Sequence, residues 1–434
     1  MLSVSPGFRQ AAIDGATTTQ VDIRVFGDPD FWLRNKDFVS ESMTLTQAIS
    51  DDDDLRFGGC IASMFEIDYT EGAPIDYRLV NKYITVFLTQ TAEITGTYPG
   101  AHLIPGENRS DELTLGSTND SAVYPNGSYY RVSVPFFSGE IESCSFVKNR
   151  LSRHLVAYDR MYWTGSLDCT TWYSDIYDKL KERDGSVTLG SLRDALLQKY
   201  RIRQSVTGDY ETHVNLPADS LSIAKIEGDV TVGYLMSKMA ELAGLFFVLD
   251  GWGNLRYVFL GSETPEHYEY YMNAEAAEFS KQKYDGWAIP GYGYFDLSSG
   301  DTFENLYLLE NDMLTAGRTA SKISDLLRPV KSQIALYYNI RSYTPSTLRA
   351  PYRLWVTTGD RISFDICFWI ITGYGTSQEY ANKMDERVDT YVLSRRITGI
   401  QAITDEITAR GSSMRLTEDG QEPLQEETQE VIVQ

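Results

Sequence analysis

Residues that could carry out acid–base, nucleophilic or metal chemistry are few in this sequence. Only four histidines are present, at positions His102, His154, His213 and His267. The nearest approach to a catalytic pair is His154 with Asp159 in RHLVAYDRMYW, but no third partner is evident and neighbours on a strand point to alternating faces. The sequence contains no HExxH, GxSxG or P-loop motif. We predict no catalytic and no cofactor-binding residue, although a carboxylate pair for glycoside hydrolysis stays open because its separation is spatial.

Three further patterns resemble ligand sites without meeting their requirements. The acidic run Asp51–Asp54 lacks the glycine and the twelfth-position glutamate of a calcium-binding loop, so it predicts a solvated turn before a strand. The segment 291–293 reads Gly-Tyr-Gly, but no third glycine and no helix follow, which argues against a dinucleotide site. We interpret the cysteines as reduced core thiols without zinc spacing; they are Cys60, Cys144, Cys169 and Cys367. No metal site is therefore predicted.

Composition narrows the class of protein. The 434 residues are enough for two to four domains, and 42% hydrophobic with 23% charged residues is typical of a globular chain. The 61 acidic and 39 basic residues give a net charge of -22, which disfavours non-specific binding to nucleic acid or anionic lipid. A negative wall could still let DNA slide past without sticking. No apolar run approaches the ~18 residues of a membrane span, so we expect no membrane anchor.

The clearest structural pattern lies in residues 231–260. Apolar residues recur at helical spacing from Val232 to Ala243, and Gly244 can end the helix. An apolar run, 246–249, is followed by Asp-Gly-Trp-Gly-Asn and by an alternating segment, which indicates a β-hairpin. Two more helices are predicted at 170–180 and 188–200. Together these elements predict a compact α+β module.

The flanking regions are mostly β. Short alternating segments up to about residue 165 favour a barrel or a sandwich. Residues 95–120 indicate a long loop, 318–327 a short helix, and the apolar run 366–371 a buried strand or a subunit-facing surface. The last residues are acidic, and their composition alone is typical of a disordered tail.

Four stretches, in order along the chain, resemble tail hub (baseplate hub) proteins of tailed bacteriophages and prophages. They are the opening SPGFRQAAIDG with its following strand, LRFGGCIAS after the acidic turn, the helix and hairpin of 231–260, and TYVLSRRITGIQAITDEITARG. The chain departs from many family members by ending soon after the last stretch, where they continue into longer domains. The resemblance implies an α+β, β-rich fold with two tube-like β-barrel domains and a smaller helix-plus-hairpin module.

On this resemblance we expect four parts: a first tube-like β-barrel (1–165), the α+β module (166–260), a second β-barrel with associated strands (261–413) and the acidic C-terminal tail (414–434). The resemblance implies a non-enzymatic structural virion protein, assembled in the bacterial host cytoplasm. It would be a homotrimeric hub with a lumen for DNA ejection that adapts the six-fold tube to three-fold tip proteins. Implied partners are the distal tail protein or tail tube, the tape measure protein, tail tip, spike or fibre proteins, and phage DNA without sequence-specific binding.

Two alternatives stay open at this point. One is a tail-associated cell-wall hydrolase, which would need a pocket with a perturbed carboxylate. The other is a receptor-binding or carbohydrate-binding tip protein, favoured by the 29 tyrosines and 7 tryptophans of the chain. The hub hypothesis further predicts a net acidic channel lining.

Overall fold

The computed structural model describes the chain in twelve stretches. These are residues 6–14, 17–50, 55–70, 79–93, 129–147, 152–261, 263–276, 286–291, 293–296, 306–327, 343–372 and 379–409. The acidic run 51–54, the loop predicted at 95–120 and the tail 414–434 lie outside them.

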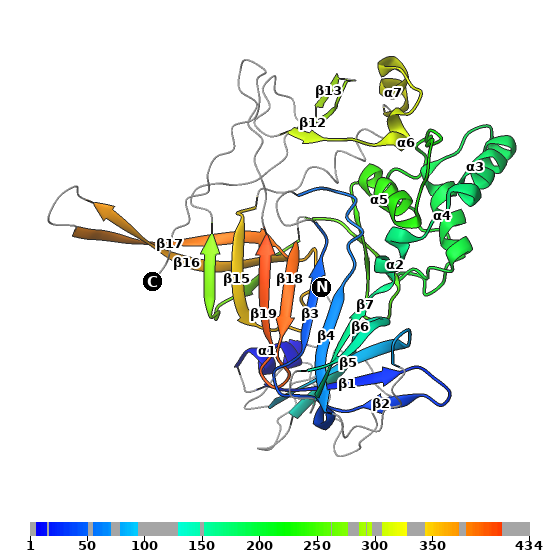
Figure 1. Cartoon of the computed structure of the whole chain (residues 1–434). Coiled ribbons are helices and arrows are strands. Elements are labelled where there is room, and N and C mark those ends of the chain that lie inside the picture. Colours follow the sequence, from blue (N-terminus) through cyan, green and yellow to red (C-terminus); the bar gives the residue numbers. More distant parts are fainter. Residues whose placement is uncertain are drawn as a thin grey trace.

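One antiparallel sheet of eleven strands dominates the molecule (Figure 1). Its order from one edge to the other is β11 (Asn273–Ala276), β15 (Ser346–Pro351), β19 (Thr404–Ala409), β18 (Ser394–Thr398), β3 (Thr44–Ala48), β4 (Met64–Thr70), β7 (Ser152–Tyr158), β6 (Tyr129–Phe146), β5 (Tyr83–Glu93), β1 (Thr17–Val25) and β2 (Phe31–Leu33). The pairing of β3 with β18 sets Leu45 opposite Ile397. Strands from the two ends of the chain therefore belong to one sheet.

Alternation of side chains gives this sheet one apolar face. In β1 the buried hydrophobic residues are Val21, Ile23 and Val25, which fits the alternation predicted for this part of the chain, and β4 repeats the pattern. The apolar face is covered by helix α1 (Pro6–Asp14) and by a small sheet of β10 (Glu266–Tyr268), β16 (Arg361–Thr372) and β17 (Glu379–Tyr391). Phe8 of α1 meets Trp355 edge to face, with ring centroids 6.1 Å apart. A short 3₁₀ helix, η1 (Asn35–Asp37), follows β2.

The predicted α+β, β-rich class is confirmed. Among the strands that the structure describes, the end strands β11 and β2 do not pair with each other, so this sheet is open and no closed barrel is seen. The two tube-like barrels and the boundaries at residues 165, 260 and 413 stay predictions.

Helices α2 to α5 gather beside the large sheet, on the right of Figure 1. They are α2 (Arg160–Ser166), α3 (Thr170–Asp184), α4 (Leu189–Tyr200) and α5 (Val232–Ala243), followed by the hairpin of β8 (Phe246–Leu249) and β9 (Leu255–Val258). Thr231 caps α5 through the backbone N–H of Tyr234, and Gly244 ends it with a φ of 67°. The predicted helix and hairpin are confirmed, and so are the helices predicted at 170–180 and 188–200.

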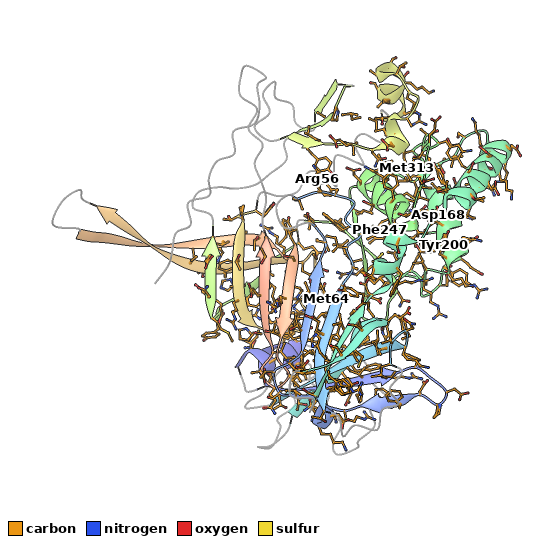
Figure 2. All side chains as sticks on the ribbon, in the orientation of Figure 1. Arg56, Met64, Asp168, Tyr200, Phe247 and Met313 are labelled. Carbon is orange, nitrogen blue, oxygen red and sulfur yellow. The ribbon has the colours of Figure 1, made fainter. Side chains whose placement is uncertain are left out.

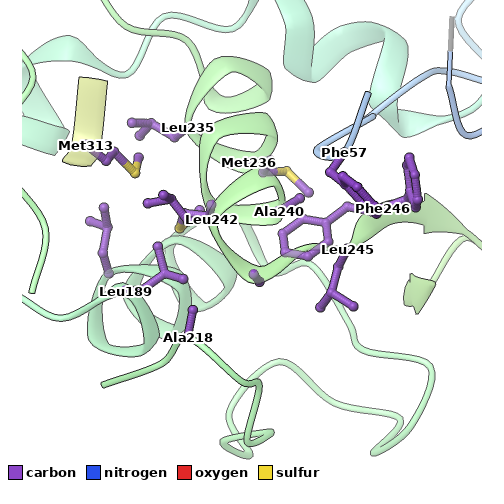
Figure 3. Close-up of a cluster of buried hydrophobic side chains, with 14 of the residues drawn as sticks. Phe57, Leu189, Ala218, Leu235, Met236, Ala240, Leu242, Leu245, Phe246 and Met313 are labelled. Atoms are coloured by element: carbon purple, nitrogen blue, oxygen red, sulfur yellow. The ribbon is translucent and has the colours of Figure 1, made fainter. Parts of the chain in front are cut away.

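The apolar stripe of α5 is the centre of a second core (Figure 3). Leu235 and Leu242 lie among residues of α4 and α6, whereas Met236 and Ala240 approach Phe57 and Phe246. This core also takes residues from β14 (Leu306–Leu308), α6 (Asp312–Thr315) and α7 (Ala320–Leu327), and β14 pairs with β12 (Gly286–Ile289), which pairs with β13 (Gly293–Asp296). The hairpin turn rests on the large sheet, because Ser138 donates a hydrogen bond to the carbonyl of Gly251 at 2.7 Å.

Candidate functional site

The face of the large sheet opposite its core is polar over six neighbouring strands. We call it the polar face; on β7, β4, β3, β18, β19 and β15 it includes His154, Val156, Met64, Glu66, Asp68, Thr44, Thr46, Ser394, Arg396, Thr398, Thr404, Glu406, Thr408, Thr347 and Arg349. At the strand ends Tyr158, Ala48 and Pro351 lie on the same face. Figure 2 labels Met64 within the sheet. Strict alternation creates the face, since every second residue of a strand points away from the core. Short hydroxyl side chains are its commonest members.

The register orders the charges of the polar face. Glu406 of β19 is paired on one side with Arg396 and on the other with Arg349, so one row reads Arg–Glu–Arg across three strands. The hydroxyls of Thr398 and Thr404 lie 2.9 Å apart in the next row. Three carboxylates and two guanidinium groups give the face a net charge of -1 when His154 is neutral. The large negative charge of the chain is therefore not concentrated here.

The structure does not bring the pair suggested by the sequence together. His154 Nδ1 lies 2.7 Å from Asp68 Oδ1, and its Nε2 lies 3.5 Å from Glu66 Oε1. Asp159 instead caps α2, accepting hydrogen bonds from the backbone N–H groups of Met161 and Ser63, both at 2.9 Å. Burial raises the pKa of the Asp159 carboxyl to about 6, although these hydrogen bonds oppose the shift. Sequence proximity misled here because Asp159 lies just beyond the end of β7.

A second charged cluster lies beside a depression of about 600 Å³ in the α+β module. The buried Arg193 guanidinium binds the carboxylates of Asp194 and Asp219. His213 Nδ1 lies 2.5 Å from Asp194 Oδ2, and its Nε2 is 3.1 Å from Asn215 Oδ1. This cluster joins the loop before Asp219 to α4. Nothing in the sequence spacing of these residues pointed to it.

The cluster contains one part of a catalytic arrangement, a histidine oriented by a carboxylate. A dyad of carboxylate and imidazole can activate a nucleophile or water, but an acyl-transfer site also needs donors for the developing oxyanion. The nearest candidates, the amides of Leu189 and Gly190 at the start of α4, already donate to the carbonyls of Leu221 and Asp219. These two backbone amides are therefore not free to act as such donors beside His213.

The remaining candidates singled out in the sequence are the other histidines and the cysteines. His267 Nδ1 lies 3.2 Å from Ser363 Oγ, and His102 is outside the described residues. Cys60, Cys144 and Cys169 are free thiols, whereas the side chain of Cys367 is not among those described. In the part of the chain covered by the structure, no group of three or more His, Cys, Asp or Glu side chains could hold a metal ion, and no helix could span a membrane.

An aromatic surface lies toward the β2 edge of the large sheet, beyond the strands of the polar face. Trp32 of β2 packs against Phe87 of β5, and Phe87 against Trp252 of the hairpin turn, with ring centroids 5.6 and 5.7 Å apart. Trp252 is 58% exposed and Trp32 38%. We call these three residues the aromatic patch. Sequence reasoning missed it, because its members are far apart in the chain and only the sheet and the docked hairpin bring them together.

Comparisons with known proteins give likeness in structure only. No protein-family model and no curated protein matches the sequence. Among solved structures, the chain is similar to a tail protein from Neisseria meningitidis MC58, with a TM-score of 0.48 and 11% identity over 91% of this chain and 97% of that one. The 43 kDa tail protein of prophage MuSo2 from Shewanella oneidensis matches with a TM-score of 0.45 and 11% identity over 90% and 98% of the two chains.

A structure of the phage P2 baseplate in its activated conformation matches with a TM-score of 0.26 and 8% identity, over 89% of this chain and 98% of that one. Likeness at this level does not by itself establish a shared function. These three structures are of a tail protein, a prophage tail protein and a phage baseplate.

Proposed function

We propose that this chain is a structural protein of a phage tail: a homotrimeric hub that closes the lower end of the tail tube and leaves a lumen through which DNA is ejected. The proposal rests on the four ordered stretches of sequence that resemble phage tail hubs. It also rests on the form of the molecule, whose most extensive functional surface is a sheet face and not a cleft.

The polar face is the observation that carries the proposal. It spans six strands drawn from both ends of the chain, is rich in hydroxyl groups and carries almost no net charge. A surface past which DNA slides must avoid both strong binding of phosphates and apolar contact with bases. A hydroxyl-rich face with a net charge of only -1 meets both conditions, although it is much less acidic than the channel lining predicted from the charge of the whole chain. We therefore assign the polar face to the lumen.

The proposed partners follow from the same arrangement. Three copies around the lumen would meet the distal tail protein or tail tube on one side and tip, spike or fibre proteins on the other, with the tape measure protein in the channel. Exposed aromatic residues are enriched at protein interfaces, so the aromatic patch is a candidate for one of these contacts. Assembly would take place in the host cytoplasm, where free thiols are ordinary.

Cryo-electron microscopy of intact particles tests the proposal. We expect three copies on the tail axis with the polar face toward the channel. A single copy per tail, or a position away from the axis, would refute the hub. A trimer whose channel is lined by another surface would retain the hub and refute the assignment of the polar face.

A cell-wall hydrolase is the second candidate, and the Asp194–His213 pair beside the depression is the observation that favours it. The purified chain would then release soluble fragments from peptidoglycan, and His213→Ala would abolish the release. A His267→Ala variant is the matched control, because His267 lies in a different part of the molecule. Release that is equal in both variants, or absent from the wild type, would exclude this reading.

A carbohydrate-binding tip protein is a third candidate, favoured by the exposed indole rings of Trp32 and Trp252. Aromatic faces can stack on the apolar face of a sugar ring. Binding of the isolated chain to host cells, lost in Trp252→Ala and kept in Trp163→Ala, would support this function. Equal binding by the two variants would exclude the aromatic patch as a sugar site.

A further inference from the structure

The α+β module carries a cluster of exposed basic residues that stands out in an acidic chain. We call it the basic patch; it consists of Arg160 at the start of α2 and of Lys199, Arg201 and Arg203 at and beyond the end of α4. Arg160 joins the two segments, because its guanidinium donates to the carbonyls of Tyr200 and Arg201 at 2.5 and 3.2 Å. Figure 2 labels Tyr200 at this position.

Among the described residues these cations form no ion pair with a carboxylate, although the buried Asp159 directly precedes Arg160. Three other exposed arginines are paired with carboxylates: Arg24 with Asp30, Arg34 with Asp22 and Arg387 with Asp365. Among the residues that the structure describes, no carboxylate lies within ion-pair distance of any member of the basic patch. Like charges gathered on one surface repel one another, and a negative partner would relieve that repulsion.

Apolar groups border the cations. Tyr162 and Trp163 of α2 follow Arg160 directly and are 43% and 37% exposed. Their rings meet edge to face at 4.9 Å, and Tyr162 also stacks on Tyr158 at 4.2 Å. Cations beside a fixed pair of aromatic rings suit a ligand with both carboxylates and aliphatic side chains.

One segment of this chain has that chemistry. Residues 412–434 contain six acidic residues and one arginine, a net charge of -5, and end in the apolar run Val431-Ile432-Val433. The last strand, β19, ends at Ala409. A segment of this length spans up to about 75 Å when extended, so it can reach α4 from β19.

We propose that the acidic segment 412–434 docks on the basic patch of the α+β module. Its carboxylates face the cations of the patch, and its aliphatic residues pack on Tyr162 and Trp163. The segment then ties the end of the sheet to the module. The contact does not depend on the hub function, because it uses only residues of this chain.

Limited proteolysis of the full-length chain with a protease of broad specificity, such as proteinase K, tests the docking, with intact mass as the readout, because the charge changes below then neither add nor remove its cleavage sites. Reversing two cations in Arg201→Glu/Arg203→Glu is expected to speed cleavage within 412–434 by about tenfold, the effect of about two lost exposed ion pairs. The matched control is Lys179→Glu/Lys181→Glu, which makes the same charge change at the same spacing on α3 and should leave the rate unchanged. Raising the salt to about 0.5 M should bring the wild type to the rate of the first variant, because screening shortens the reach of the charges.

A charge swap gives the decisive comparison. Adding Glu426→Lys/Glu427→Lys to Arg201→Glu/Arg203→Glu should restore protection. A second reversal, Lys199→Glu/Arg203→Glu, leaves the helix cap at Arg201 intact and should act like the first, so a folding defect in one variant does not decide the outcome. Equal cleavage rates in the wild type and both patch variants would overturn the proposal.

Nucleic acid is the competing occupant of a basic surface, and it enters the test as a separate arm. A fluorescent DNA duplex is expected not to bind the wild-type chain, because the surrounding charge is strongly negative. Duplex binding that the patch variants abolish, without a change in cleavage of 412–434, would assign the patch to DNA and overturn the docking of the segment.

Discussion

The large sheet and the α+β module treat buried charge differently. In the sheet, Arg395 and Asp405 form an ion pair whose side chains are 2% and 0% exposed, and the same guanidinium donates to the carbonyl of Val356. In the module, Arg193 is also 2% exposed, but its partners Asp194 and Asp219 are 25% and 14% exposed.

The two regions thus differ in how far their buried charges are shielded from water. The sheet seals the Arg395–Asp405 ion pair into its core and also carries a broad open polar face. In the module, Asp194 links the buried Arg193 to the exposed His213, and the basic patch lies on the surface of the same module. We infer that the sheet acts through the extent of its surface, and that the module acts through local contacts.

The largest effect is expected from breaking the sealed ion pair. Asp405→Ala leaves the Arg395 guanidinium buried without its carboxylate and should lower the free energy of unfolding by about 3–5 kcal/mol, measured by urea denaturation. Asp219→Ala should cost clearly less, because water reaches that part of the module. The double variant Arg395→Met/Asp405→Leu removes both charges and should recover much of the loss. An equal cost for the two single variants would contradict the comparison.

The second effect concerns the seam between the regions, where Asp159 ends β7 and caps α2. Its folded-state pKa is raised from 3.8 to about 6, so protonation favours the folded state. This contribution is fully present below pH 3.8 and is lost as the pH rises through about 6. Over this window the stability of Asp159→Asn relative to the wild type should rise by up to about 3 kcal/mol. Parallel stability curves for the two proteins from pH 3.5 to 7, to within about 0.5 kcal/mol, would contradict the raised pKa.

A smaller effect is expected within the module. Thr188 caps α4 by accepting a hydrogen bond from the backbone N–H of Ser191. Thr188→Ala should lower the free energy of unfolding by about 1 kcal/mol, measured by thermal denaturation, while Thr188→Ser should stay close to the wild type. If serine costs as much as alanine, the hydroxyl is not what stabilises the start of this helix.

The smallest effect is expected on the polar face. Thr46 points away from the core, opposite Arg396 of β18 and Met64 of β4. Thr46→Ser should change the free energy of unfolding by less than about 0.5 kcal/mol, as at other surface positions. The neighbouring Leu45 is fully buried, and Leu45→Ala should cost about 2–5 kcal/mol in the same measurement. Similar costs at the two positions would mean that the face is not open.

Local structure was within reach of the sequence. Helix α5 could be predicted from its apolar stripe, Val232 to Ala243, because a helix repeats every 3.6 residues. Its ends could be predicted because Thr231 and Gly244 are residue types that favour the N-cap and the C-cap. Alternation in β1 likewise specified which residues are buried. The order of helices and hairpin, and the β-rich class, followed from such local patterns.

Contacts between distant segments were decided only by the tertiary structure. Alternation tells which side of a strand is apolar, but not that β3 lies between β4 and β18, since the period is the same for every possible neighbour. For the same reason the sequence suggested Asp159 as the partner of His154. In the structure, β4 pairs with β7, and the partners of His154 are therefore Asp68 and Glu66. The aromatic patch and the basic patch exist because folding brings together residues that no spacing rule connects.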